Sequence, residues 1–205
     1  SGTLTQNKLS VVLVVAFEQG LSEADVLHFA LWACKVQSMD AIDSAVIEAV
    51  KRTSHFDMDT IAQYETLEFE PFTARTRKTE ATIRVHGELF RASKGAVATI
   101  VSDCAIEEGS DAAQWVSLQV RSACEKGYRV LGVAGAAFDA EIGGFRPMQL
   151  KGLICMADPL RESSMRVVEE LGRMGVLVKM ITGDNTAVAR NVASQLGLNG
   201  EIVKF

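Results

Sequence analysis

Several patterns with a clear functional meaning are missing from this 205-residue sequence. The longest apolar stretch, residues 11–17, is far shorter than the ~18 residues that a membrane-spanning helix needs. The four cysteines show no C-x-x-C spacing and the three histidines do not join them, so reduced thiols fit better than a metal cluster. No long run of lysine and arginine occurs and the net charge is −5, which argues against nucleic acid as a partner.

What is present is the composition of an ordinary folded protein. Hydrophobic residues make up 48% of the chain and charged residues 23%, and these values argue against disorder. A chain of this length forms one large domain or two small ones, and either can bury a real core. The order of the predicted helices and strands therefore has to define the fold.

The first two thirds of the chain predict an antiparallel sheet with flanking helices. Ser22 and Asp25 form a capping-box pattern at the start of a helix, and β-branched or alternating segments indicate strands. The predicted strands are 8–17, 65–72, 78–86, 89–93 and 128–138, and the predicted helices are 22–35, 40–52, 96–103 and 111–126. We assign this mixed antiparallel lobe to residues 10–148.

The remaining residues show a different pattern, in which apolar strands alternate with amphipathic helices. Strands are predicted at 149–157 and 176–182, and helices at 162–174 and 186–196. Continuous apolar strands that alternate with helices are typical of a parallel sheet covered on both faces. The predicted class is therefore α/β, with the antiparallel lobe inserted in a partial parallel-sheet lobe made of residues 1–9 and 149–205.

A phosphate site is predicted where the strand at 176–182 ends. In an open parallel sheet, ligands bind beyond the carboxyl ends of the strands, and this strand delivers Thr182-Gly183-Asp184-Asn185 to that edge. Gly183 allows close approach to an anion, and Thr182 can donate a hydrogen bond to it. Asp184 would repel phosphate without a cation between them, which predicts Mg²⁺. The alternative is that Asp184 or Asn185 simply caps the next helix.

A second turn, Asp158-Pro159-Leu160-Arg161, follows the predicted strand at 149–157. Proline fixes the turn, and Arg161 could reach a phosphate or pair with Asp158. A hinge with an internal ion pair explains these residues equally well, so both interpretations stay open.

Four segments, in this order, resemble motifs of the P-type ATPases. Ser1-Gly2-Thr3-Leu4-Thr5 resembles the tail of the phosphorylation motif Asp-Lys-Thr-Gly-Thr-Leu-Thr, and Lys94-Gly95-Ala96 resembles Lys-Gly-Ala-Pro-Glu. Asp158-Pro159-Leu160-Arg161 resembles Asp-Pro-Pro-Arg, and Thr182-Gly183-Asp184 matches Thr-Gly-Asp. Asp40-Ala41-Ile42-Asp43 and the stretch around Phe72 look most similar to plasma-membrane proton pumps. The resemblance covers essentially the whole chain.

This resemblance implies a nucleotide-binding domain inserted in a phosphorylation domain of haloacid-dehalogenase-like fold, with ATP and Mg²⁺ as cofactors. Phe72 would stack on adenine, Lys94 and Gly95 would line the same pocket, and Asp40 and Asp43 would lie near it. The phosphate end would be contacted by Arg129, by Asp158 and Arg161 at the turn, and by the phosphoryl-group residues Thr3, Thr182, Gly183 and Asp184. Without the resemblance, Phe72 would be read as core, Lys94 and Arg129 as surface charges, and Asp40 as a helix cap.

The implied function is the cytoplasmic ATP-binding part of a pump that exports a cation, with the proton favoured and Ca²⁺ or Mg²⁺ as alternatives. The nucleophilic aspartate would lie two residues before Ser1, so this chain alone is expected to bind ATP as a monomer without pumping. Its partners would be the rest of the phosphorylation domain and the actuator and transmembrane domains, in the plasma membrane. A soluble phosphatase with residues 10–148 as its cap, and a non-catalytic nucleotide sensor, are the other hypotheses.

Overall fold

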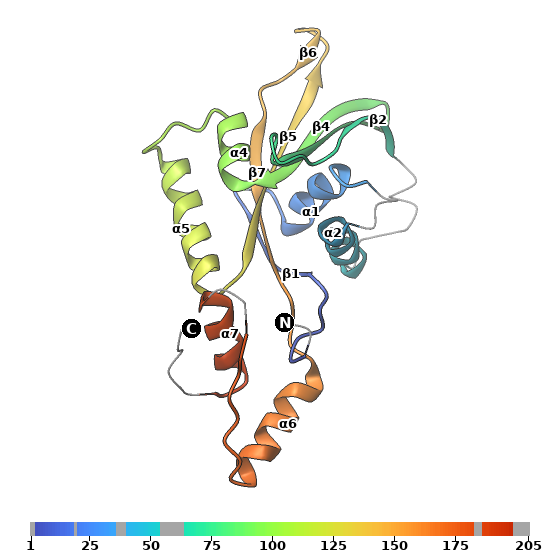
Figure 1. Cartoon of the computed structure of the whole chain (residues 1–205). Helices are drawn as coiled ribbons and strands as arrows, with labels where there is room; N and C mark the ends of the chain where they lie inside the picture. The colour runs from blue at the N-terminus through green and yellow to red at the C-terminus, as the bar shows by residue number, and fades with distance from the viewer. Residues whose placement is uncertain (1–2, 19, 36–39, 54–63, 183–185, 199–205) are drawn as a thin grey trace.

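The computed structural model describes residues 3–18, 20–35, 40–53, 64–182 and 186–198. These residues form an antiparallel sheet with helices packed around it, and a smaller part that carries the last helices (Figure 1). The strands are β1 Ser10–Ala16, β2 Tyr64–Glu70, β3 Lys78–Val85, β4 Glu88–Ala96, β5 Arg129–Asp139, β6 Gly144–Phe145 and β7 Gln149–Ala157. The helices are α1 Glu23–Trp32, α2 Ala41–Arg52, α4 Val97–Asp103, α5 Asp111–Glu125, α6 Glu162–Arg173 and α7 Thr186–Gln195. The predicted α/β class is confirmed.

The strands follow the order β1-β7-β5-β4-β3-β2, and β6 pairs with β5 beside this path. A tight turn joins β3 to β4, where Val85 pairs with Glu88. His86 and Gly87 both have positive φ, at 50° and 87°, which suits the twist of a two-residue hairpin. The predicted capping box is present at the start of α1, because Ser22 and Asp25 each accept a hydrogen bond from the other's backbone N–H.

Helices cover both faces of the sheet, and the two faces have separate cores. The first core joins α1 and α2 to the sheet and includes Val133 and Ile154, and the second joins α4 and α5 to the sheet and includes Ala134 and Leu150. Val133 and Ala134 are neighbours on β5, so their side chains point to opposite faces. This double coverage explains why β5 and β7 are apolar along most of their length.

The sequence prediction was wrong about the direction of the strand at 149–157. This segment forms β7, which is antiparallel to β1 on one side and to β5 on the other. No parallel strand pair occurs in the described part of the chain. A continuous apolar run indicates that both faces of a strand are buried. Helices on both faces of an antiparallel sheet produce the same pattern as in a parallel sheet. The proposed domain limits at 9/10 and 148/149 remain a prediction.

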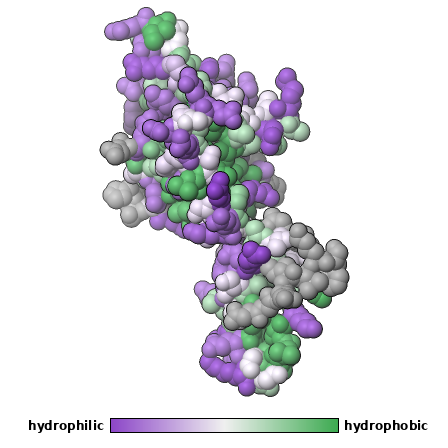
Figure 2. Space-filling view, turned by 90° about the vertical axis from the view of Figure 1, so that its left-hand side faces the viewer, coloured by the Kyte–Doolittle hydropathy of each residue, from purple (hydrophilic) through white to green (hydrophobic). Residues whose placement is uncertain are grey.

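The predicted strand at 176–182 is also absent. The described residues between α6 and α7 have no regular secondary structure, and Leu177 and Ile181 are 90% and 89% exposed. No described strand pairs with this segment, so its apolar side chains do not join a sheet. Figure 2 shows apolar surface at the end of the molecule that carries α6, where Met165 and Met174 are also exposed. None of the helices among the described residues has the length and hydrophobicity of a membrane span.

Replacing Leu153 and Leu177 separately by alanine tests this arrangement. Leu153 in β7 is fully buried, so Leu153→Ala should lower the free energy of unfolding by ~2–5 kcal/mol. Leu177→Ala should change it by less than ~0.5 kcal/mol, because this side chain is 90% exposed. Urea unfolding followed by circular dichroism measures both, and equal losses would mean that the segment around Leu177 is packed.

Candidate functional site

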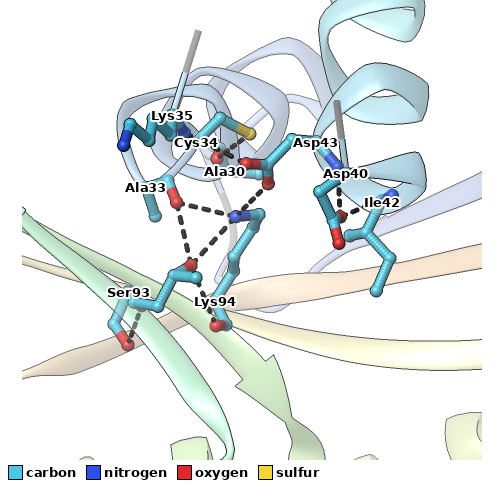
Figure 3. A network of polar contacts seen from close by, with 10 residues as sticks. Ala30, Ala33, Cys34, Lys35, Asp40, Ile42, Asp43, Ser93 and Lys94 are labelled. Atoms are coloured by element: carbon cyan, nitrogen blue, oxygen red, sulfur yellow. Dashed lines mark hydrogen bonds and ion pairs between the residues drawn. The ribbon is translucent and has the colours of Figure 1, made fainter. Parts of the chain in front are cut away.

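A buried ion pair joins the sheet to the helices at one candidate site. The Lys94 side chain on β4 is only 3% exposed, and its Nζ lies 2.8 Å from Oδ1 of Asp43 on α2 (Figure 3). The same ammonium group donates to the backbone oxygen of Ala33 at 2.6 Å and to Oγ1 of Thr79 at 2.9 Å. These three acceptors match the three N–H bonds of an ammonium group. Lys94 is therefore a buried and fully paired cation, and its interpretation as a solvated surface charge is wrong.

The carboxylate of Asp43 has a second partner besides Lys94. Its Oδ2 accepts a hydrogen bond from the backbone N–H of Lys35 at 3.1 Å, and its side chain is 8% exposed. A buried ion pair is better tolerated when further hydrogen bonds support it, and each oxygen of this carboxylate has a partner. The nearby thiol of Cys34 donates to the backbone oxygen of Ala30, and burial raises the pKa of this thiol to about 12.

Asp40 acts as a helix cap in this structure. Its Oδ1 accepts from the backbone N–H groups of Ile42 at 2.8 Å and Asp43 at 3.1 Å, so it closes the first turn of α2. The cap fixes the turn that carries Asp43. A contact between Asp40 and a nucleotide remains a prediction.

Phe72 lies just after β2 and is 61% exposed, so its interpretation as a core residue is wrong. The turn that follows is closed by hydrogen bonds between Thr73 and Thr76 and by Arg77, whose N–H donates to the backbone oxygen of Thr73 at 2.8 Å. An exposed aromatic ring on a fixed turn provides a face on which a flat ligand can stack.

Gly95 connects this turn to the segment that carries Lys94. The Ala96 N–H donates to the backbone oxygen of Arg77 at 2.9 Å. A Cβ added to Gly95 would lie 2.4 Å from that same oxygen, so only glycine permits this approach. Backbone hydrogen bonds through Arg77 thus link the turn after Phe72 to the strand end that carries Lys94 and Gly95.

A second candidate site lies in the smaller part of the molecule. Thr3 and Thr182 line one cavity of about 60 Å³, together with Leu4, Thr5, Met180, Ile181, Ala189 and Val192. The two threonines come from opposite ends of the sequence. Gly183 and Asp184, predicted for the same site, lie outside the described residues. Among the described residues, no group of three His, Cys, Asp or Glu side chains is arranged to hold a metal ion, and the Mg²⁺ assignment to Asp184 remains a prediction.

Two segments of the chain enter the smaller part, one before β1 and one after β7, and hydrogen bonds join them side by side. The hydroxyl of Thr5, a buried residue, donates to Asp158 Oδ2 at 2.7 Å, and the Lys8 N–H donates to Asp158 Oδ1 at 3.1 Å. The backbone oxygen of Leu4 accepts from the N–H of Arg161 at 2.9 Å and from the hydroxyl of Ser164, also at 2.9 Å. These bonds tie Asp158 and the backbone of Arg161 to the segment before β1, and both the hinge and the contact with phosphate stay predictions. The sequence interpretation did not assign Thr5 or Ser164, although Thr5 belongs to the motif tail.

Arg129 is close in sequence to residues that contact each of the two candidate sites. It is exposed and begins β5, four residues before Val133, which pairs with Lys94. At about 3.3 Å per residue, Arg129 is ~13 Å along the strand from the level of Lys94. On the other side, Gly127 touches α7, the helix that lines the Thr3–Thr182 cavity.

Replacing Lys94 by methionine tests the buried pair. Lys94→Met leaves the Asp43 carboxylate buried without its cation, so the free energy of unfolding should fall by ~3–5 kcal/mol. Arg173→Ala removes one partner of an exposed helical pair and should cost less than ~1 kcal/mol. Chemical denaturation measures both, and a loss below ~1 kcal/mol for Lys94→Met would contradict the structure.

Thiol alkylation at pH 8 tests the packing around the same pair. Burial raises the pKa of Cys34 to about 12 and that of Cys104 to about 11, so little reactive thiolate forms at either position. Cys124 is exposed and should react first. Mass spectrometry of timed samples gives the order, and early modification of Cys34 would show that the core around Lys94 opens readily.

A scan against protein-family models finds no match for this chain. Curated proteins do match: a Methanocaldococcus jannaschii protein assigned as a cation-transporting ATPase is 34% identical over 205 residues, which cover 100% of this chain and 24% of that protein. Plasma membrane ATPase 1 of Saccharomyces cerevisiae is 34% identical over 211 residues, which cover 98% of this chain and 22% of that protein. This chain therefore spans about a quarter of the length of these relatives.

Solved structures agree at the level of the fold. A crystal structure of a zinc-transporting PIB-type ATPase superposes with a TM-score of 0.68 and covers 97% of this chain and 27% of that one, at 21% identity. A second crystal structure of a zinc-transporting PIB-type ATPase, in a different state, gives a TM-score of 0.67 at 22% identity. At this level of identity the likeness concerns the fold alone, and the sequence relatives supply the family. Together, they place this chain among the P-type ATPases.

Proposed function

We propose that this chain is the ATP-binding part of a P-type pump that exports a cation, with the proton as its cargo, through an aspartyl-phosphate intermediate. The observation that carries the proposal is the meeting of Thr3 and Thr182 in one cavity. Two motifs from opposite ends of the chain converge there, across a bonded hinge from an exposed aromatic residue. The names of the relatives, cation-transporting and plasma membrane ATPases, support the cargo class and a plasma-membrane location.

In this proposal the adenine of ATP stacks on Phe72. The ring is 61% exposed, and the backbone of Arg77 ties its turn to Gly95. The Lys94 ammonium already has three acceptors, so it contributes mainly by holding α2 and β4 together behind the pocket. Asp40 and Asp43 shape the same wall, because one caps α2 and the other pairs with Lys94.

The phosphates of ATP would run from this pocket past Arg129 to the Thr3–Thr182 cavity. The guanidinium group of Arg129 would contact a phosphate, and the hydroxyl groups of Thr3 and Thr182 would donate to the transferred phosphoryl group. Phosphoryl transfer requires mainly positioning and charge neutralisation, which these donors supply together with Mg²⁺ held by Asp184. The hinge at Asp158 and Arg161 would set the distance between adenine and phosphoryl group.

Phe72→Ala tests the nucleotide assignment. ATP should bind the unaltered chain with high-micromolar to millimolar affinity, and loss of stacking worth ~1–3 kcal/mol should weaken it by roughly 5- to 150-fold. Leu118→Ala is a matched control, because Leu118 is 62% exposed but lies on α5. Amide chemical shifts during an ATP titration report both affinities, and shifts that survive Phe72→Ala unchanged would remove Phe72 from the site.

A further inference from the structure

Gly127 ends helix α5 in the way that many helices end. Its φ is +72°, its N–H donates to the backbone oxygen of Cys124 at 2.9 Å, and the Tyr128 N–H donates to that of Ala123 at 3.0 Å. A left-handed residue just after a helix is most often glycine, because glycine has no Cβ to strain. The turn alone would therefore account for a glycine at this position.

The surroundings of Gly127 give it a second role. A Cβ on this residue would lie 2.6 Å from Cα and 2.8 Å from N of Val188, and 3.0 Å from the carbonyl carbon of Ala187. These are backbone atoms of α7, so no side-chain rotation can make room. The other positive-φ glycines of the described chain have nothing within 4 Å of the same point: Gly20, Gly87, Gly109, Gly143, Gly175 and Gly197. The close approach at Gly127 is thus a contact between α7 and the turn from α5 to β5, which lie side by side in Figure 1.

Helix α7 also forms part of the cavity that holds Thr3 and Thr182. Ala189 and Val192 line that cavity, and Ala189 directly follows Val188, which touches Gly127. A single helix therefore contacts both the cavity and the turn that precedes Arg129. Arg129 is two residues beyond Gly127, at most ~7 Å of chain, and Ala189 is one helical rise of ~1.5 Å from Val188.

We propose that Gly127 is a positioning residue: it seats α7 against the α5–β5 turn and so fixes Arg129 relative to the Thr3–Thr182 cavity. The inference rests on the proposed function for the role of Arg129 as a phosphate contact. ATP must reach from Phe72 to the cavity, so its phosphates contact Arg129 and the hydroxyl donors together only when these groups keep their spacing. Any side chain at position 127 pushes α7 away and separates Arg129 from the hydroxyl donors. Adenosine has no phosphates, so its binding does not depend on the contact between Gly127 and α7.

Gly127→Ala and Gly175→Ala form a matched pair for the test. Both residues follow a helix and have nearly the same φ, +72° and +75°, so alanine adds the same backbone strain at each. Of these two positions, only 127 has neighbours within 4 Å. Gly127→Ala should weaken ATP binding about tenfold, leave adenosine binding unchanged and speed amide hydrogen exchange in α7. Gly175→Ala should do none of these.

A double-variant cycle separates positioning from general damage. If Gly127 acts through Arg129, then Gly127→Ala combined with Arg129→Gln should bind ATP no more weakly than Arg129→Gln alone. Additive losses, or equal losses of ATP and adenosine binding, would overturn the proposal. If the unaltered chain binds no ATP, the proposed function fails. If amide hydrogen exchange in α7 is unchanged by Gly127→Ala, the proposed contact between Gly127 and α7 is refuted.

Discussion

The ammonium group of Lys94 is the point on which the larger part of the structure depends. It lies on β4 and bonds to the end of α1 through Ala33, to α2 through Asp43 and to β3 through Thr79. One cation therefore fixes four elements relative to one another. In a low-dielectric interior such a group is favourable only when every partner is in place, so the positions of these elements cannot vary independently.

The two candidate sites follow from this arrangement. The strand that carries Lys94 continues into Gly95, whose bare backbone receives Arg77 and so fixes the turn that displays Phe72. β5 pairs with β4 and starts at Arg129, two residues after Gly127, which contacts the helix that lines the Thr3–Thr182 cavity. The sheet therefore sets the distance between the exposed ring of Phe72 and the hydroxyl groups of Thr3 and Thr182.

Local features of the fold were predictable because they depend on neighbours in sequence. The caps at Ser22 and Asp40 follow from residue type and spacing, and the strands predicted before residue 158 lie within a few residues of their predicted limits. The direction of β7 was not predictable, because its apolar run records burial on both faces and not which strands flank it. The segment at 176–182 has the composition of a strand, yet pairing depends on a partner that the sequence of the segment does not specify.

Some features of the candidate sites were likewise predictable from the sequence and others were not. The resemblance pointed to Thr3 and Thr182, and the structure brings them together, but the burial of Lys94 came from long-range pairing that the spacing of Asp43 and Lys94 does not reveal. The contact between Gly127 and α7 was equally unpredictable, because a glycine after a helix already has a local explanation. Residues whose role depends on distant backbone therefore escape analysis of sequence alone.

The bonded passages near Asp158 have a mechanical consequence. Two chain segments that run side by side and share hydrogen bonds resist sliding past each other, since sliding would break Thr5–Asp158 and Leu4–Arg161 together. These hydrogen bonds therefore hold the two segments in one register where they pass from the larger part of the molecule to the smaller part.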